Sequence, residues 1–129
     1  MSVEMGCLYA AMVLAHVHLT AASFSFKAQV ENRNTVGPRD EDLRPTGLAG
    51  RLDRAQRNFL ETFPVFVAGV LMAHLLDRSG VMSAVGALTY IGGRTLFLPL
   101  YAWGVPWLRT FAWNIATLGL VLVMIQLVV

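Results

Sequence analysis

Four long stretches with few or no charges divide this chain, and they limit its fold more than any other feature. Residues 5–26 and 110–129 contain no Asp, Glu, Lys or Arg. Residues 62–76 are also uncharged, and residues 81–101 contain only Arg94. About 20 helical residues cross the roughly 30 Å hydrocarbon core of a bilayer. Because 56% of the 129 residues are hydrophobic, we expect the chain to fold in lipid.

The sequence predicts an all-α fold, an integral membrane four-helix bundle made of one domain, residues 1–129. The uncharged run 62–76 is too short to span a bilayer alone, so its helix must begin earlier, among charged residues. Most charges, with several Gly and Pro residues, lie in one long connection after the first helix. The expected helices cover approximately 4–26, 50–76, 80–101 and 107–129, with a loop at 27–49.

The distribution of Lys and Arg predicts the orientation of the chain in the membrane. Nearly all cationic residues outside the helices lie in the long loop or beside Arg109, whereas Arg78 lies at the opposite end. The positive-inside rule then places the loop in the cytoplasm and both termini outside. Nucleic acid is not an expected partner, because acids alternate with the basic residues of the loop. No metal site is expected, because His16 and His18 do not share a helical face.

Charged side chains continue into the second helix, where a membrane would penalise them. Arg51, Arg54, Asn58 and Glu61 follow one another at steps of three, four and three, which places them on one helical face. Arg57 stands four residues before Glu61, and we expect these two to pair. Charges at membrane depth cost several kcal/mol, so they normally face a bundle interior or a polar cavity.

The third helix carries a matching polar stripe. Tyr90, Arg94, Phe97 and Tyr101 are spaced by four, three and four residues. With Arg109 at the start of the fourth helix, the two stripes are expected to converge in a cavity open to the cytoplasm. Arginines exceed acids there, which indicates an anionic guest held by guanidinium groups. The alternative is that these residues pair with one another and only fix the helix packing.

The stretch RAQRNFLETFP, residues 54–64, resembles a motif of the MAPEG family, the membrane-associated proteins of eicosanoid and glutathione metabolism. That motif reads close to R-A-Q-x-N-x-x-E-x-F-P in the second helix of the family's glutathione-dependent enzymes. The resemblance covers nearly the whole chain and points to a bacterial-type member in an inner membrane. It implies a homotrimer that binds glutathione between neighbouring protomers.

The resemblance also implies roles for individual residues. Arg109 would be the catalytic residue that holds the glutathione thiol as thiolate. The second and third helices would bind the rest of the tripeptide through Arg54, Gln56, Asn58, Glu61, Arg94 and Tyr101. Two positions depart from the family pattern, because Gly50 stands where a glutamate is usual and Phe97 where a tyrosine is common.

The expected function is therefore a glutathione transferase or peroxidase that acts on a lipophilic small molecule taken from membrane lipid. One alternative is a non-catalytic member of the same fold with a structural or lipid-binding role. A small anion carrier is a weaker alternative, because a transport path needs polar residues along the whole depth of the bilayer. The sequence does not identify the electrophile.

Overall fold

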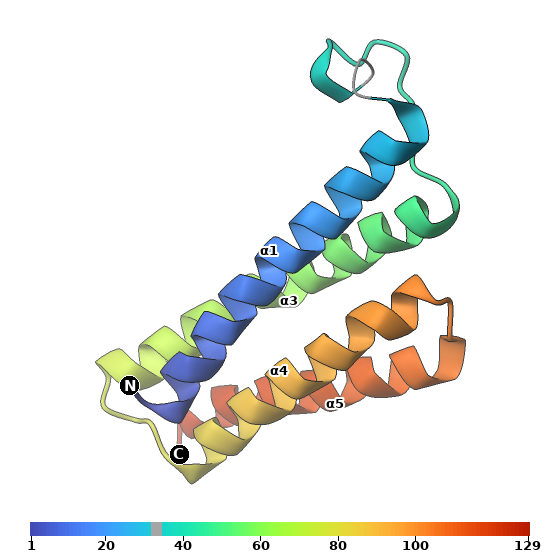
Figure 1. The fold of residues 1–129 in the computed structure, drawn as a ribbon. Coiled ribbons are helices and arrows are strands. Elements are labelled where there is room, and N and C mark those ends of the chain that lie inside the picture. Colours follow the sequence, from blue (N-terminus) through green and yellow to red (C-terminus); the bar gives the residue numbers. More distant parts are fainter. Residues whose placement is uncertain (32–34) are drawn as a thin grey trace.

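The structure, a computed structural model, describes residues 1–31 and 35–129, and in these residues it contains four long helices and no strand (Figure 1). They are α1 (Val3–Val30), α3 (Gly47–Leu75), α4 (Val81–Ala102) and α5 (Pro106–Gln126). Each is long and apolar enough to cross a membrane. The predicted all-α four-helix bundle is thus confirmed.

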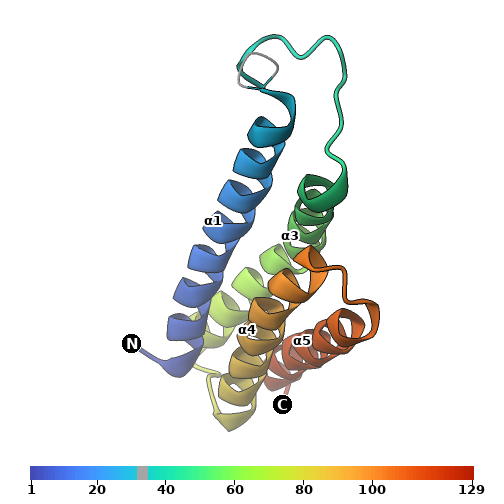
Figure 2. The ribbon, with the colours of Figure 1, turned by 45° about the vertical axis from the view of Figure 1, so that its right-hand side comes forward.

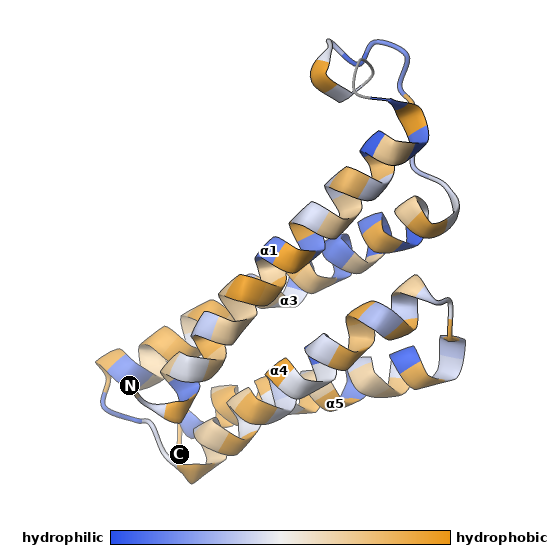
Figure 3. Cartoon of the chain, viewed as in Figure 1, coloured by the Kyte–Doolittle hydropathy of each residue, from blue (hydrophilic) through white to orange (hydrophobic). Residues whose placement is uncertain are grey.

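Helices α3 and α4 are the central elements of the bundle, because each contacts the three other helices. Successive helices run in opposite directions, and both termini lie at the end opposite the long loop (Figures 1 and 2). Hydrophilic residues gather in that loop and at the adjoining end of α3, whereas the helix lengths are mostly hydrophobic (Figure 3). The charged start of α3 is therefore placed against the last turns of α4.

Helices α4 and α5 pack more closely than any other pair, and glycines allow it. A Cβ atom on Gly86 would lie only 2.6 Å from the carbonyl oxygen of Gly119. A Cβ on Gly93 would lie 2.8 Å from the carbonyl oxygen of Ala112. Small residues allow backbones to approach in membrane helices, where van der Waals packing drives association. A Cβ on Gly92 would meet no atom within 4 Å, so Gly92 plays no such role within the protomer.

The apolar core lies in the half of the bundle away from the loop. Phe66 of α3 stacks on Tyr90 of α4 with 4.1 Å between ring centroids. Around this pair lie small or branched side chains from all four helices: Cys7, Leu8, Ala11, Val70, Ala87, Ala116, Leu120 and Val123. The loop end of the bundle has a smaller core and more polar contacts, and it is there that the site residues are found.

Helix α1 continues four residues beyond the predicted end at residue 26, and α3 begins three residues before the predicted start at residue 50. Gln29 accounts for both differences. Its Oε1 accepts a hydrogen bond from the Thr46 amide at 3.0 Å, and its Nε2 donates to the Thr46 hydroxyl at 2.6 Å. Thr46 is the residue that precedes α3. One side chain thus ties the last turn of α1 to the first turn of α3 and shortens the loop.

Candidate functional site

Polar contacts join α3 and α4 along the half of the bundle next to the loop. Helices α3 and α4 are antiparallel, so residues further along α3 contact residues nearer the start of α4. Arg51 Nε donates to the Ala102 carbonyl at 2.8 Å, Arg54 Nε to Tyr101 Oη at 3.3 Å, and Arg94 Nη1 to Asn58 Oδ1 at 2.8 Å, while the hydroxyls of Thr62 and Tyr90 lie 3.0 Å apart. The structure therefore brings the two polar stripes together.

A pocket of about 250 Å³ opens beside these contacts, where α5 begins. Its walls come from α3, α4 and α5: Asn58, Phe97, Tyr101, Arg109, Thr110 and Trp113. The pocket thus unites three of the predicted site residues, one from each helix. It is amphipathic, since a cation, an amide and two hydroxyls face two large aromatic rings.

Arg109 is the charged group of this pocket. Its Cζ lies 4.5 Å from the centroid of the Tyr101 ring, and the side chain is half-buried. Among the residues that the structure describes, Arg109 has no hydrogen bond and no ion pair. A guanidinium carries five N–H donors, so this group retains its donors for a guest.

Arg94 lies behind the pocket wall instead of in it. Only 1% of its surface is exposed, and it is not a lining residue. Its Cζ lies 4.4 Å from the Phe97 centroid and 5.3 Å from that of Phe59, which is cation–π geometry. In the protomer, its hydrogen bond goes to Asn58, so its effect on a guest passes through the wall residues.

The remaining predicted binding residues of α3 do not line this pocket. Arg54 and Glu61 are exposed and stand seven residues apart, which places them on one outer face. Gln56 faces another pocket, of about 380 Å³, which α1 and the loop also line. Within one protomer, the structure therefore joins Asn58, Tyr101 and Arg109, places Arg54 at the edge of this group, and separates Gln56 from it.

The expected pairing of Arg57 with Glu61 is wrong. Arg57 Nε lies 3.2 Å from Asp53 Oδ2, on the preceding turn. An acid four residues before a base is the more favourable order on a helix, because it also matches the helix dipole. Among the described residues, Glu61 keeps no hydrogen-bond or ion-pair partner and faces outward.

The departure at Gly50 has a steric basis. A Cβ on Gly50 would lie 3.0 Å from the carbonyl oxygen of Pro45 and 3.3 Å from Nη1 of Arg54. A Cβ at this position would therefore be tight against the loop and against Arg54, and either would have to shift by a few tenths of an ångström.

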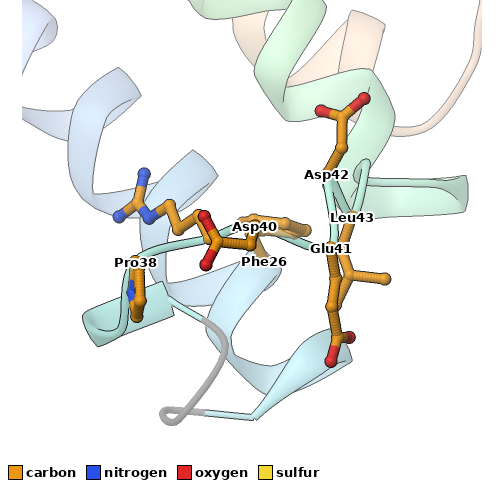
Figure 4. A pocket seen from close by; sticks show the side chains of 7 residues that line it. Phe26, Pro38, Asp40, Glu41, Asp42 and Leu43 are labelled. Atoms are coloured by element: carbon orange, nitrogen blue, oxygen red, sulfur yellow. The ribbon is translucent and has the colours of Figure 1, made fainter.

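A larger cavity, of about 450 Å³, lies within the loop and contains none of the predicted site residues (Figure 4). Its lining includes Asp40, Glu41 and Asp42 but only one cation, Arg39. An anionic guest would be repelled there by the excess of carboxylates. Of these two pockets, the charges favour the smaller one beside Arg109.

Trp113 and Thr110 were not predicted as pocket residues. Trp113 stands four residues after Arg109, so the 3.6-residue period contained the signal that both face the same side. Trp103 and Trp107 are exposed, at 78% and 84%, whereas Trp113 is half-buried.

His18 is a buried residue that sequence reasoning left without a role. It is 1% exposed and stacks on Phe59 at 4.8 Å, whereas His16 is exposed. The two histidines therefore occupy different faces of α1. In the described part of the chain, no group of three His, Cys, Asp or Glu side chains is arranged to hold a metal.

The comparisons with known proteins agree with the motif at residues 54–64. The family model of the MAPEG family matches residues 4–129. No curated protein and no solved structure matches the chain. Four apolar helices and this match fit an integral, multi-pass membrane protein. With nearly its whole length matched, the chain belongs to the MAPEG family, which includes glutathione transferases and peroxidases among other members.

Proposed function

We propose that this chain is a glutathione-dependent membrane enzyme of the transferase or peroxidase type, acting on a lipophilic electrophile. The observation that carries the proposal is the pocket in which Arg109 keeps free donors beside Asn58 and Tyr101. A free thiol has a pKa near 8.5, and a neighbouring cation lowers it because it stabilises the thiolate. Arg109 thus supplies the cation that makes a bound thiol nucleophilic at neutral pH.

The charges around the pocket match the rest of glutathione. The tripeptide has two carboxylates and one ammonium group. Arg54 offers a guanidinium whose Nε holds Tyr101, and Glu61 offers an unpaired carboxylate on the same outer face. Guanidinium groups bind carboxylates in bidentate geometry, and an ammonium group needs an acid. One face of α3 therefore provides partners for both ends of the molecule.

The chemistry requires only the thiolate and the electrophile. In transfer, the sulfur electron pair forms a bond to an electrophilic carbon, and either a leaving group departs or the adduct takes up a proton. In peroxide reduction, two glutathione molecules become a disulfide while the peroxide becomes an alcohol and water. The lipophilic partner reaches the site from membrane lipid, and glutathione arrives from the cytoplasm.

The positions of Gln56 and Arg109 support a site shared between protomers of a homotrimer. Gln56 lines the pocket between α1, the loop and α3, whereas Arg109 lines the pocket between α3, α4 and α5. Gln56 and Asn58 are two residues apart on α3, which turns them to nearly opposite sides of the helix. A single glutathione meets both sets of residues if the faces of adjacent protomers adjoin.

One observation favours the non-catalytic alternative. Arg51, Asn58 and Arg94 all make contacts that would hold α3 against α4 in a purely structural protein. The catalytic and the non-catalytic functions differ in their expected effect on an added thiol. Protein purified in detergent should increase the ultraviolet absorbance of glutathione thiolate at neutral pH, and should conjugate glutathione to an aryl chloride. A protein that does neither is the structural or lipid-binding member.

A further inference from the structure

Arg94 is the most deeply buried charge in the described chain, and part of its hydrogen-bonding capacity is unused. Its Nε and Nη2 atoms are buried and have no partner, while Nη1 donates to Asn58 Oδ1 at 2.8 Å. Burying a guanidinium costs several kcal/mol even after relaxation. Within the described residues, the bond to Asn58 is the only hydrogen bond of this buried cation.

That interaction determines which way the Asn58 amide faces. A guanidinium only donates hydrogen bonds, so Arg94 can bond to the carbonyl oxygen of Asn58 and not to its NH₂ group. The oxygen is thereby turned toward Arg94, away from the guest. Because Asn58 also lines the pocket beside Arg109, the two N–H donors of its Nδ2 are the part left for that pocket.

Arg94 supports a second wall residue in the same way. Its Cζ lies 4.4 Å from the centroid of Phe97, and Phe97 lines the pocket that Arg94 itself does not reach. Arg94 thus contacts two neighbouring wall residues from behind. Both contacts depend on a buried cation with little freedom to move, since the side chain is 1% exposed.

We propose that Arg94 is a positioning residue that fixes the Asn58 amide, so that Asn58 donates to the anionic group of the guest held beside Arg109. The inference rests on the proposed function, in which that anion is the glutathione thiolate. It gives the thiolate two kinds of donor, a guanidinium from α5 and a neutral amide from α3. The glutathione carboxylates are the other anionic groups that Asn58 could serve, and the test separates them.

The direct test is nuclear magnetic resonance of protein carrying ¹⁵N-asparagine, with the Asn58 side-chain signal assigned by its loss in Asn58→Asp. The first probe is glutathione sulfonate, which holds a permanent anion at the sulfur position. We expect it to shift the Asn58 NH₂ signals more than S-methylglutathione, which keeps both carboxylates but cannot form a thiolate. Equal shifts with both probes would assign Asn58 to a carboxylate and overturn the thiolate role.

Variants at Arg94 test the positioning role. Arg94→Met removes the donor, so glutathione affinity should fall about tenfold and the Asn58 signals should move without ligand. Arg94→Lys keeps a donor and should restore most of the affinity. Tyr90→Phe is the matched control, because it removes the next polar contact between α3 and α4 without touching the pocket. It should lower the melting temperature and leave the affinity and the Asn58 shift unchanged.

The experiments distinguish failure of the inference about Arg94 from failure of the proposed function. A wild-type protein that binds glutathione sulfonate without moving the Asn58 signals overturns this inference and leaves the proposed function intact. A wild-type protein that binds neither probe overturns the proposed function and the donor role with it. Equal loss of affinity in Arg94→Met, Arg94→Lys and Tyr90→Phe shows that Arg94 only holds the bundle together.

Discussion

Tyr101 links Arg54 to Arg109. Its hydroxyl accepts a hydrogen bond from Arg54 Nε at 3.3 Å, and its ring lies 4.5 Å from the Cζ of Arg109. One phenol therefore sets the separation between a cation from α3 and a cation from α5. In the proposed site, these cations bind different parts of glutathione, so their effects should be separable by substitution.

Arg109→Ala should raise the pKa of bound glutathione thiol toward its free value of about 8.5. The wild-type complex has the depressed pKa, so its activity is present above that pKa and is lost as the pH falls through it. In the variant, the rise of activity should move to higher pH, with a smaller loss of affinity. Thiolate absorbance across a pH series measures the shift, and Arg109→Lys, which keeps the charge, is the control. An unchanged thiol pKa in Arg109→Ala would exclude the catalytic assignment.

Arg54→Ala and Glu61→Gln should weaken glutathione binding by about 2 kcal/mol or more, because each leaves a charge of the ligand unpaired. The thiol pKa in the remaining complex should change little. Tyr101→Phe refines the test, since it keeps the ring over which Arg109 lies and removes only the bond to Arg54. Calorimetric titration with glutathione gives the affinities. A raised thiol pKa in Arg54→Ala would show that its role is not confined to a carboxylate.

Residue spacing was sufficient to predict that polar residues of α3 and α4 meet. The steps of three and four along each helix fix a face, and a short connection makes neighbours antiparallel. Spacing could not choose between Asp53 and Glu61 as the partner of Arg57, because both stand four residues away. The order of acid before base weakly favours Asp53, because it matches the preferred i, i+4 arrangement on a helix.

Other features depended on the tertiary structure. Gly50 is explained by the path of the loop, which brings Pro45 over it, and no local pattern encodes that path. Arg94 was expected in the pocket, but its stripe also faces the core, and its depth there depends on how Phe59 and Phe97 enclose it. Residue spacing predicts which face of a helix a side chain occupies, but it does not predict how deeply that side chain is buried.

More Lys and Arg residues lie in the loop than at the opposite end of the bundle, which predicts that the loop faces the cytoplasm. Asp40 is exposed and lies in this loop, so Asp40→Cys provides a labelling site. The single native cysteine, Cys7, is buried and should be replaced by Ala first. In membrane vesicles of known orientation, a charged maleimide should label position 40 only from the cytoplasmic side. Labelling only from the other side would reverse the orientation and the route by which glutathione enters.

The close approach of α4 and α5 predicts a stability difference between two glycines of α4. Gly86→Ala places a methyl group 2.6 Å from the Gly119 carbonyl, so the helices must separate, at about 1–3 kcal/mol. Gly92→Ala meets no atom within 4 Å and should be neutral or stabilising, since alanine favours the helix. Thermal unfolding in detergent compares the two. Equal melting temperatures would show that the close helix contact does not limit stability.

The separation of Gln56 from Arg109 predicts that defective protomers can complement one another. In the proposed homotrimer, each site takes Arg109 from one protomer and Gln56 from its neighbour. Gln56→Leu and Arg109→Ala should each be impaired alone, because every site then lacks one group. Each cyclic trimer that mixes the two variants regenerates one complete site, about a third of its sites. Co-expression with two affinity tags isolates the mixed trimers, and glutathione conjugation measures their activity.

A protomer carrying both substitutions, mixed with the wild type, controls for dilution. Activity no higher than that of the single variants would place the site within one protomer, and a monomer by native mass measurement would remove the shared site altogether.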